Sequence, residues 1–117
     1  MNDEFNTIKS ETRAEMKVLG SRFIASVAPV TAKVTAEQFL AGIRKEFWDA
    51  THNCFAYRIG MDDKEFRFND DGEPSGSAGK PILAAIDKFE LTNTAVVVTR
   101  YFGGTKLGVG GLVRAYG

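Results

Sequence analysis

The stretch "TAVVVTRYF", residues 94–102, together with the "GGTKLGVGG" that follows at 103–111, decides the fold. The first part is rich in β-branched residues and apolar on both of its alternating sides, which is typical of a strand in the middle of a sheet. Glycine permits backbone conformations that a Cβ atom forbids, and it lets a ligand approach the main chain closely. The sequence therefore predicts a central strand that opens into a glycine-rich loop.

Upstream of this strand, alternating and helical spacings predict the order strand, strand, helix, strand, strand, helix. The expected strands are residues 13–19, 21–29, 52–60 and 65–69. The expected helices are residues 35–48, with Thr35 as N-cap, and residues 79–90. After the glycines, residues 112–117 have the pattern of a third helix that stops after about two turns.

This order of elements indicates an α+β domain, and we expect a two-layer sandwich in which a mixed β-sheet carries the helices on one face. The aromatic side of strand 52–60 is expected to face the helices. Its other side carries His52, Cys54 and Arg58, and we expect that face of the sheet to be open. The apolar positions predict a core formed by Phe39, Leu40, Ile43, Phe47, Ile82, Leu83, Ile86, Val96 and Val98.

Length and composition exclude several classes of protein. The chain has 117 residues, with 15 lysines and arginines against 15 aspartates and glutamates. One domain is expected at this length, and a net charge of zero provides no field that would draw the whole molecule to nucleic acid or to a membrane. The apolar runs fall far short of the about 20 residues that span a bilayer, and the single Cys54 suits a reducing compartment. We expect a cytoplasmic protein.

The glycine-rich loop is a candidate anion site, although it matches neither standard nucleotide-binding pattern. It lacks the Gly-Lys pair of a Walker A loop, and Val113 stands where the dinucleotide fingerprint requires glycine. Beyond Glu90 the chain has no acidic residue, and the N-terminus of the expected third helix would favour an anion. The glycines either hold a phosphate group or only permit tight turns. The candidate residues are Arg58, Arg100, Gly103, Gly104, Lys106, Gly108, Gly110, Gly111 and Arg114.

A second polar loop, "DDGEPSGSAG" at residues 70–79, has two interpretations. It departs from the calcium-binding template, because Arg67 and Ala78 stand at ligand positions. It is either a solvated turn or a contact for a partner protein. The residues that would contact such a partner are Asp70, Asp71 and Glu73.

Candidate catalytic groups are few. His52 and Cys54 lie two residues apart on one side of a strand, so a catalytic dyad is conceivable. A lone cysteine in a strand is more often a packing residue, however, and one histidine with one cysteine is too few for a structural zinc site. The sequence predicts no catalytic residue, no metal and no cofactor.

Three segments resemble the signature of the IMPACT family, in its bacterial YigZ-like branch. They are "HNCFAYRIG" at 52–60, "DDGEPSGSAGKPIL" at 70–83 and "TRYFGGTKLGVGGLVRAYG" at 99–117. The resemblance covers about residues 17–117, with minor departures at Phe55, Ser77 and Thr105.

This resemblance implies a fold like the second domain of ribosomal protein S-five and domain IV of elongation factor G. It also implies a further, ferredoxin-like C-terminal domain, which we expect to be absent from this chain. We therefore expect a polar lead-in at residues 1–12 and an IMPACT-type N-terminal domain at 13–117 that is truncated in its last helix. Eukaryotic relatives in this family regulate translation initiation.

Three functions follow as hypotheses. The first is a translation-associated module that contacts RNA or a ribonucleoprotein through the glycine loop and the open sheet face, without a DNA-specific signal. The second is a protein-interaction module that regulates a translation or stress-response partner, and the third is an enzyme acting on a phosphorylated small molecule. The enzyme ranks last, because only His52, Cys54 and Asp71 offer a base or a nucleophile. The expected phosphate partners are Arg58, Arg67, Arg100, Lys106 and Arg114, with Tyr101 able to stack on bases and Phe102 expected to be buried.

Overall fold

The computed structural model describes residues 10–60 and 65–104. Its elements follow the predicted order, and their bounds differ from the predicted ones by no more than two residues. The third helix expected after the glycines lies outside the described residues. The elements are β1 (Thr12–Val18), β2 (Ser21–Pro29), α1 (Lys33–Glu46), β3 (His52–Ile59), β4 (Glu65–Asn69), α2 (Gly79–Lys88) and β5 (Thr94–Tyr101).

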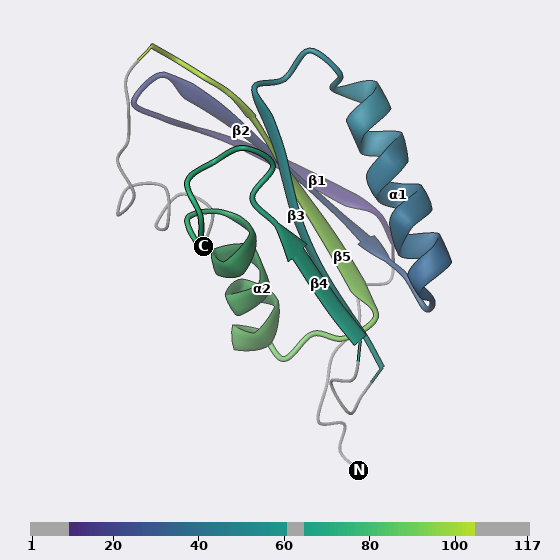
Figure 1. The fold of residues 1–117 in the computed structure, drawn as a ribbon. Coiled ribbons are helices and arrows are strands. Elements are labelled where there is room, and N and C mark those ends of the chain that lie inside the picture. Colours follow the sequence, from purple (N-terminus) through teal and green to yellow (C-terminus); the bar gives the residue numbers. More distant parts are fainter. Residues whose placement is uncertain (1–9, 61–64, 105–117) are drawn as a thin grey trace.

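The five strands form one sheet in the order β1-β2-β5-β3-β4, so β5 is central, as predicted (Figure 1). The expectation of a mixed sheet is wrong for the described residues, because each of the four strand pairs is antiparallel. The reason is the position of β5. Strands β2 and β3, which α1 connects, run in the same direction, but β5 enters between them and runs against both.

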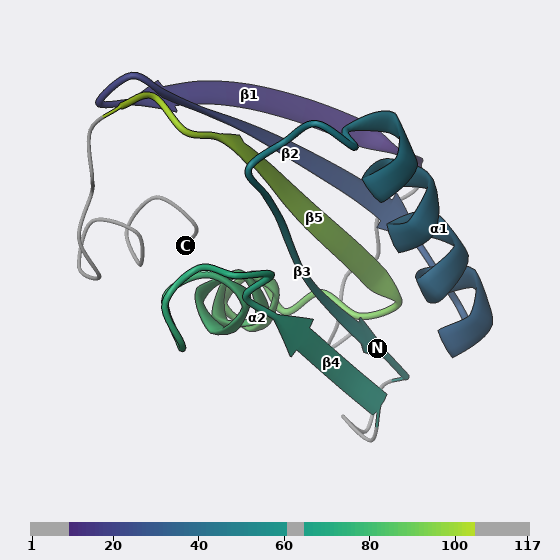
Figure 2. The ribbon, with the colours of Figure 1, turned by 45° about the horizontal axis from the view of Figure 1, so that its top comes forward.

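The two helices pack on opposite faces of the sheet, which corrects the expectation of helices on one face (Figure 2). Helix α1 covers the face on which Phe55 and Tyr57 point. Helix α2 covers the other face, where the small Cys54 and Ala56 make room for it. Both sides of β3 are therefore buried, and the arrangement is helix, sheet, helix.

The predicted core is confirmed at most of its positions. Phe39 and Phe47 on α1 are only partly buried at the edge of the α1 core. Val96 is partly buried because it faces a groove beside α2. The predicted positions that are buried are Leu40, Ile43, Ile82, Leu83, Ile86 and Val98.

The start of α1 differs from the predicted start. The N-cap is Ala32, and Thr35 lies three residues into the helix. The Thr35 hydroxyl donates to the Ala32 carbonyl at 2.8 Å and accepts from the Ala32 N–H at 3.3 Å. The Thr35 hydroxyl therefore bonds to the backbone of the first turn from inside the helix and not from the N-cap position.

Candidate functional site

The polar loop between β4 and α2, residues 70–78, is tied to the sheet by buried contacts, and we call it the docked loop. Asp70 is the first residue of the docked loop, and its side chain caps the N-terminus of α2, which begins nine residues later. Its carboxylate accepts N–H groups from Gly76 at 2.9 Å, Ala78 at 3.1 Å and Gly79 at 2.8 Å. Burial alone would raise the pKa of Asp70, but these three donors outweigh it and lower the pKa. Asp70 thus supplies the cap that Ala78, at the N-cap position, lacks a side chain to provide.

Replacing Asp70 with alanine is expected to lower the free energy of unfolding by about 0.5–2 kcal/mol, the range for loss of a helix cap. Because the folded-state pKa of Asp70 is lowered, its contribution is present at neutral pH and is lost as the pH falls through that pKa. Urea unfolding of parent and variant between about pH 7 and pH 2 measures this difference, which should shrink toward acid. Ser75→Ala, at an exposed position of the same loop, is the control. A difference that stays constant down to the lowest pH would contradict the capping role.

The centre of the docked loop is a buried ion pair with β5. Arg100 is 4% exposed and Glu73 is 7% exposed. Arg100 Nη1 lies 2.7 Å from Oε2 and 3.0 Å from Oε1 of Glu73. The Ser21 hydroxyl accepts from the Arg100 guanidinium at 3.3 Å and from the Gly103 N–H at 3.1 Å. One connected network thus joins the docked loop, the start of β2 and the end of β5.

His52 and Cys54 extend the same network at the start of β3. His52 Nδ1 donates to the Asp71 carbonyl at 2.8 Å, and its Nε2 lies 3.4 Å from Glu73 Oε1. Cys54 is buried, and its thiol donates to the Asp70 carbonyl at 3.0 Å. The His52 and Cys54 side chains therefore bond to different carbonyls of the docked loop. These contacts pack the loop against β3 and attach it there.

Arg58 lies at the opposite end of β3 from this network. Its Nε and Nη2 donate to the two carboxylate oxygens of Asp87 on α2, at 2.7 and 3.0 Å. Its guanidinium also stands over the ring of Phe66, 5.2 Å from the centroid. With 8% exposure, Arg58 joins β3 to α2, so the structure does not bring it together with Arg100.

Some of the predicted loop residues lie within the described part of the chain, and the others lie outside it. Gly103 and Gly104 follow β5, and Gly104 has a positive φ of 90° that favours glycine. Phe102 beside them is 48% exposed, so the expectation that it is buried is wrong. Of the docked-loop candidates, Asp71 accepts the Asn53 N–H at 2.7 Å. The remaining candidates lie outside the described residues: Lys106, Gly108, Gly110, Gly111 and Arg114.

Every arginine that the structure describes forms an ion pair. All six lie within 3.8 Å of a carboxylate oxygen. Four of these pairs have both partners substantially exposed, where such a pair contributes little and yields readily to another anion. The four are Arg13–Glu46, Arg22–Glu15, Arg44–Asp71 and Arg67–Glu37.

Sequence reasoning missed the pairing of Glu73 with Arg100, although it named both residues. One signal was available, because an arginine inside an otherwise apolar central strand needs a buried partner. Within residues 10–60 and 65–104, no cluster of three His, Cys, Asp or Glu side chains is placed to hold a metal ion. Neither of the two helices described there is long and apolar enough to cross a membrane.

The fold defines the class of protein first. The chain superposes on the crystal structure of a hypothetical protein with a TM-score of 0.89 and 39% identity, covering 92% of this chain and 53% of that one. It also superposes on the two-domain translational regulator Yih1 with a TM-score of 0.61 and 25% identity, covering 98% of this chain and 49% of that one. The class is thus a small α+β domain that recurs as about half of longer proteins.

The family follows from the sequence comparison. The family model of the Impact N-terminal domain matches residues 19–117, so the chain belongs to the IMPACT family, as its signature segments predicted. The IMPACT family member YvyE of Bacillus subtilis is 49% identical over 117 residues, which are all of this chain and 54% of that protein. YigZ of Escherichia coli is 44% identical over 99 residues, 83% of this chain and 48% of that protein. The chain spans about half the length of these relatives.

Proposed function

We propose that this chain is a translation-associated regulatory module that contacts RNA or a ribonucleoprotein through its glycine-rich loop. The regulatory part rests on its likeness to Yih1, which is described as a translational regulator. A location in the cytoplasm, where translation takes place, belongs to the same proposal. So does the resemblance to the second domain of ribosomal protein S-five and to domain IV of elongation factor G.

The observation that carries the RNA contact is the end of β5. Phe102 is 48% exposed there and stands directly before Gly103 and Gly104. An exposed aromatic ring gives a base a surface to stack on, at about 1–3 kcal/mol per base. Lys106 and Arg114 follow in the sequence, and no acidic residue lies beyond Glu90 to oppose a phosphate group.

The geometry narrows the set of phosphate partners within this proposal. Arg100 holds the buried Glu73 carboxylate, so binding a phosphate there would require that buried pair to break. Arg58 is itself buried and already holds the half-exposed Asp87 carboxylate. The uncovered part of the sheet beside α2 is apolar and suits no phosphate. We therefore assign the contact to Phe102, the glycines, Lys106 and Arg114.

The alternative is a protein-interaction module that regulates a translation partner. One observation favours it: Trp48, two residues after the end of α1, is 80% exposed. Tryptophan is enriched among the residues that dominate protein–protein binding. The Asp70 and Glu73 side chains have structural roles and are not available to a partner protein, because both form hydrogen bonds within the fold.

Salt dependence and two matched variants separate these functions. We expect a fluorescent single-stranded RNA and purified bacterial ribosomes to bind the chain weakly, with an affinity that falls steeply as salt increases. Lys106→Ala with Arg114→Ala should reduce the slope of log affinity against log salt by about 2, one for each lost phosphate contact. Lys33→Ala with Lys45→Ala on α1 removes the same charge and should leave the slope nearly unchanged, as should Cys54→Ser.

Fluorescence anisotropy over a salt series gives both quantities. Equal RNA binding by the Lys106 and Arg114 double variant and the parent would overturn the RNA contact, and the glycines would then serve only the turn. Ribosome or protein binding that ignores salt but is lost in Trp48→Ala would support the interaction module instead.

A further inference from the structure

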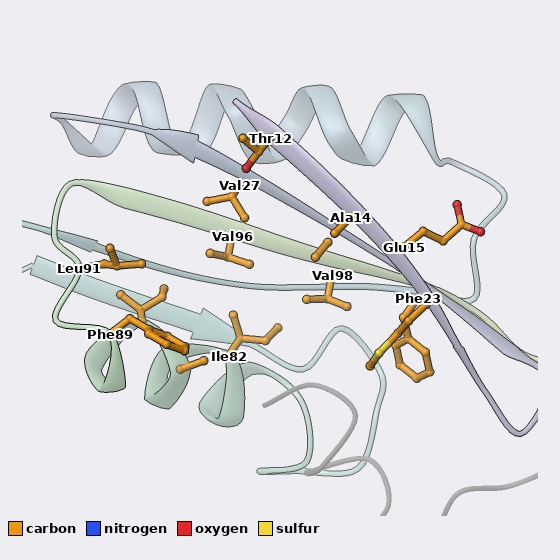
Figure 3. Close-up of a pocket in the computed structure, with 14 residues that line it drawn as sticks. Thr12, Ala14, Glu15, Phe23, Val27, Ile82, Phe89, Leu91, Val96 and Val98 are labelled. Carbon is orange, nitrogen blue, oxygen red and sulfur yellow. The ribbon is translucent and has the colours of Figure 1, made fainter. Parts of the chain in front are cut away.

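Helix α2 leaves apolar side chains uncovered on both of its sides. On one side lies a groove of about 550 Å³, with Val96 and Val98 on its floor and Phe89 on its wall (Figure 3). On the other side lies β4, which carries Phe66 and Phe68 at 52% and 38% exposure. The β4 region differs from the groove because it lies at an edge of the sheet, where backbone groups are accessible as well as side chains.

Strand β4 is the last strand of the described sheet, and each of its five residues is exposed (Figure 2). It pairs with β3 along one side. Its other side presents a row of backbone N–H and C=O groups, which is a template for pairing with one more strand. The strand has no proline, and its register with β3 runs without a bulge from Glu65 to Asn69. Two of the common protections of an edge strand are therefore absent from β4.

The two faces of β4 differ in their chemistry. Phe66 points to the α2 side, where its ring lies 5.2 Å from the guanidinium of Arg58, and Phe68 follows on the same side. Arg67 points to the α1 side, where it donates to a glutamate of α1 at 2.7 Å, and its side chain remains 48% exposed. Glu65 lies on that side too. The strand thus has an aromatic face and a face that carries one negative and one positive charge.

This pattern is complementary to itself. When two copies of β4 pair antiparallel with Phe66 opposite Phe66, each Glu65 lies opposite Arg67 of the second copy. Directly opposite side chains point to the same face, so the aromatic faces stay together, and Phe68 lies diagonal to Phe66 of the second copy, within reach of an aromatic ring. A register centred on Arg67 would place two guanidinium groups opposite each other, which is unfavourable. Charge therefore selects the register centred on Phe66.

We propose that β4 pairs with β4 of a second copy of this chain, which extends the sheet across a two-fold axis at Phe66. The pairing covers Phe66 and Phe68 between the two α2 helices and forms two Glu65–Arg67 ion pairs on the α1 side. A two-fold contact of this kind closes on itself, so it yields a dimer and not a fibre. The inference goes beyond the proposed function and is independent of RNA binding.

The dimer should be weak. A contact between two short edge strands lies at the low end of specific interfaces, below about 1,200 Å², so we expect a dissociation constant on the order of 100 µM. Analytical ultracentrifugation of the parent chain between about 10 µM and 1 mM measures it, because the dimer fraction follows protein concentration.

Two charge reversals give a complementation test of the register. Glu65→Lys places like positive charges opposite each other, and Arg67→Glu places like negative charges there. Each variant alone should therefore self-associate at least about tenfold more weakly than the parent. An equimolar mixture of the two variants should form a heterodimer about as strong as the parent dimer, because every opposing pair then has unlike charges.

The other edge strand of the sheet provides matched controls. Glu15 and Met16 on β1 are exposed, so Glu15→Lys and Met16→Ala should leave self-association unchanged, whereas Phe66→Ala should weaken it. Circular dichroism shows whether each variant is folded.

A parent chain that stays monomeric up to about 1 mM would leave the β4 edge to a strand of another protein and would overturn the proposal. A mixture of the two folded charge variants that stays monomeric would overturn it as well. Association that grows beyond a dimer, or that Glu15→Lys weakens as much as Glu65→Lys does, would indicate a contact elsewhere on the chain and would also overturn it.

Discussion

Replacing Arg100 with methionine is expected to lower the free energy of unfolding by about 3–5 kcal/mol, because it removes the guanidinium partner of the buried Glu73 carboxylate. The pair is held at 2.7 and 3.0 Å between residues that are 4% and 7% exposed. At that depth water does not replace a lost donor. Urea unfolding followed by circular dichroism measures the change.

A double-mutant cycle separates the effect of losing the charge of Arg100 from the effect of losing its side-chain volume. Glu73→Leu combined with Arg100→Met should be less destabilising than Arg100→Met alone, because the double variant removes the buried carboxylate together with its guanidinium partner. Arg22→Met breaks a pair of similar geometry at the surface, 2.6 Å from Glu15, and should change stability little. If Arg100→Met costs no more than Arg22→Met, Arg100 is not a structural partner and returns to the list of phosphate contacts.

The order of the elements could be predicted because each is encoded locally. The alternation of β3 and the helical stripe of α2 need only neighbouring residues, and both elements lie where the spacing indicates. The central position of β5 in the sheet could be predicted too. A strand that is apolar on both of its sides has to be covered on both sides. The faces covered by the helices are a different matter. They depend on whether Cys54 and Ala56 leave room for α2, and size at one position does not reveal what packs there.

Glu73 and Arg100 could be named as candidates from the sequence, but the contact between them could not be predicted. Glu73 and Arg100 are 27 residues apart and Ser21 and Arg100 are 79 apart, so no local pattern links them. Charge alone suggests a surface role for each of them, and only the fold reveals that they neutralise each other. Asp70 illustrates the same limit, because its three N–H donors depend on the path of the docked loop.

Replacing Gly103 with alanine is expected to disturb the end of the sheet more than ordinary overpacking, which costs about 1–3 kcal/mol. A Cβ atom at Gly103 would lie 2.1 Å from the carbonyl carbon of Gly20, 2.2 Å from its oxygen and 2.4 Å from the Ser21 nitrogen. These are backbone atoms, so no side-chain rotation relieves the contact. Either the β1–β2 turn or the end of β5 has to move.

The control for this substitution is another glycine in the same chain. A Cβ atom at Gly42 on α1 meets nothing within 4 Å. Gly42→Ala should therefore raise the free energy of unfolding by about 0.5–1 kcal/mol, through helix propensity. Thermal unfolding of both variants beside the parent measures the contrast.

The Gly103 result bears on what the glycine loop is for. The Gly103 N–H donates to the Ser21 hydroxyl, and the same hydroxyl accepts from Arg100, which holds Glu73. Moving Gly103 should therefore also weaken the buried pair, so Gly103→Ala and Arg100→Met should destabilise the chain by less together than the sum of their separate effects. Strict additivity would show that the loop is anchored independently of the network. A Gly103→Ala chain as stable as the parent would contradict the close approach of Gly103 to Gly20.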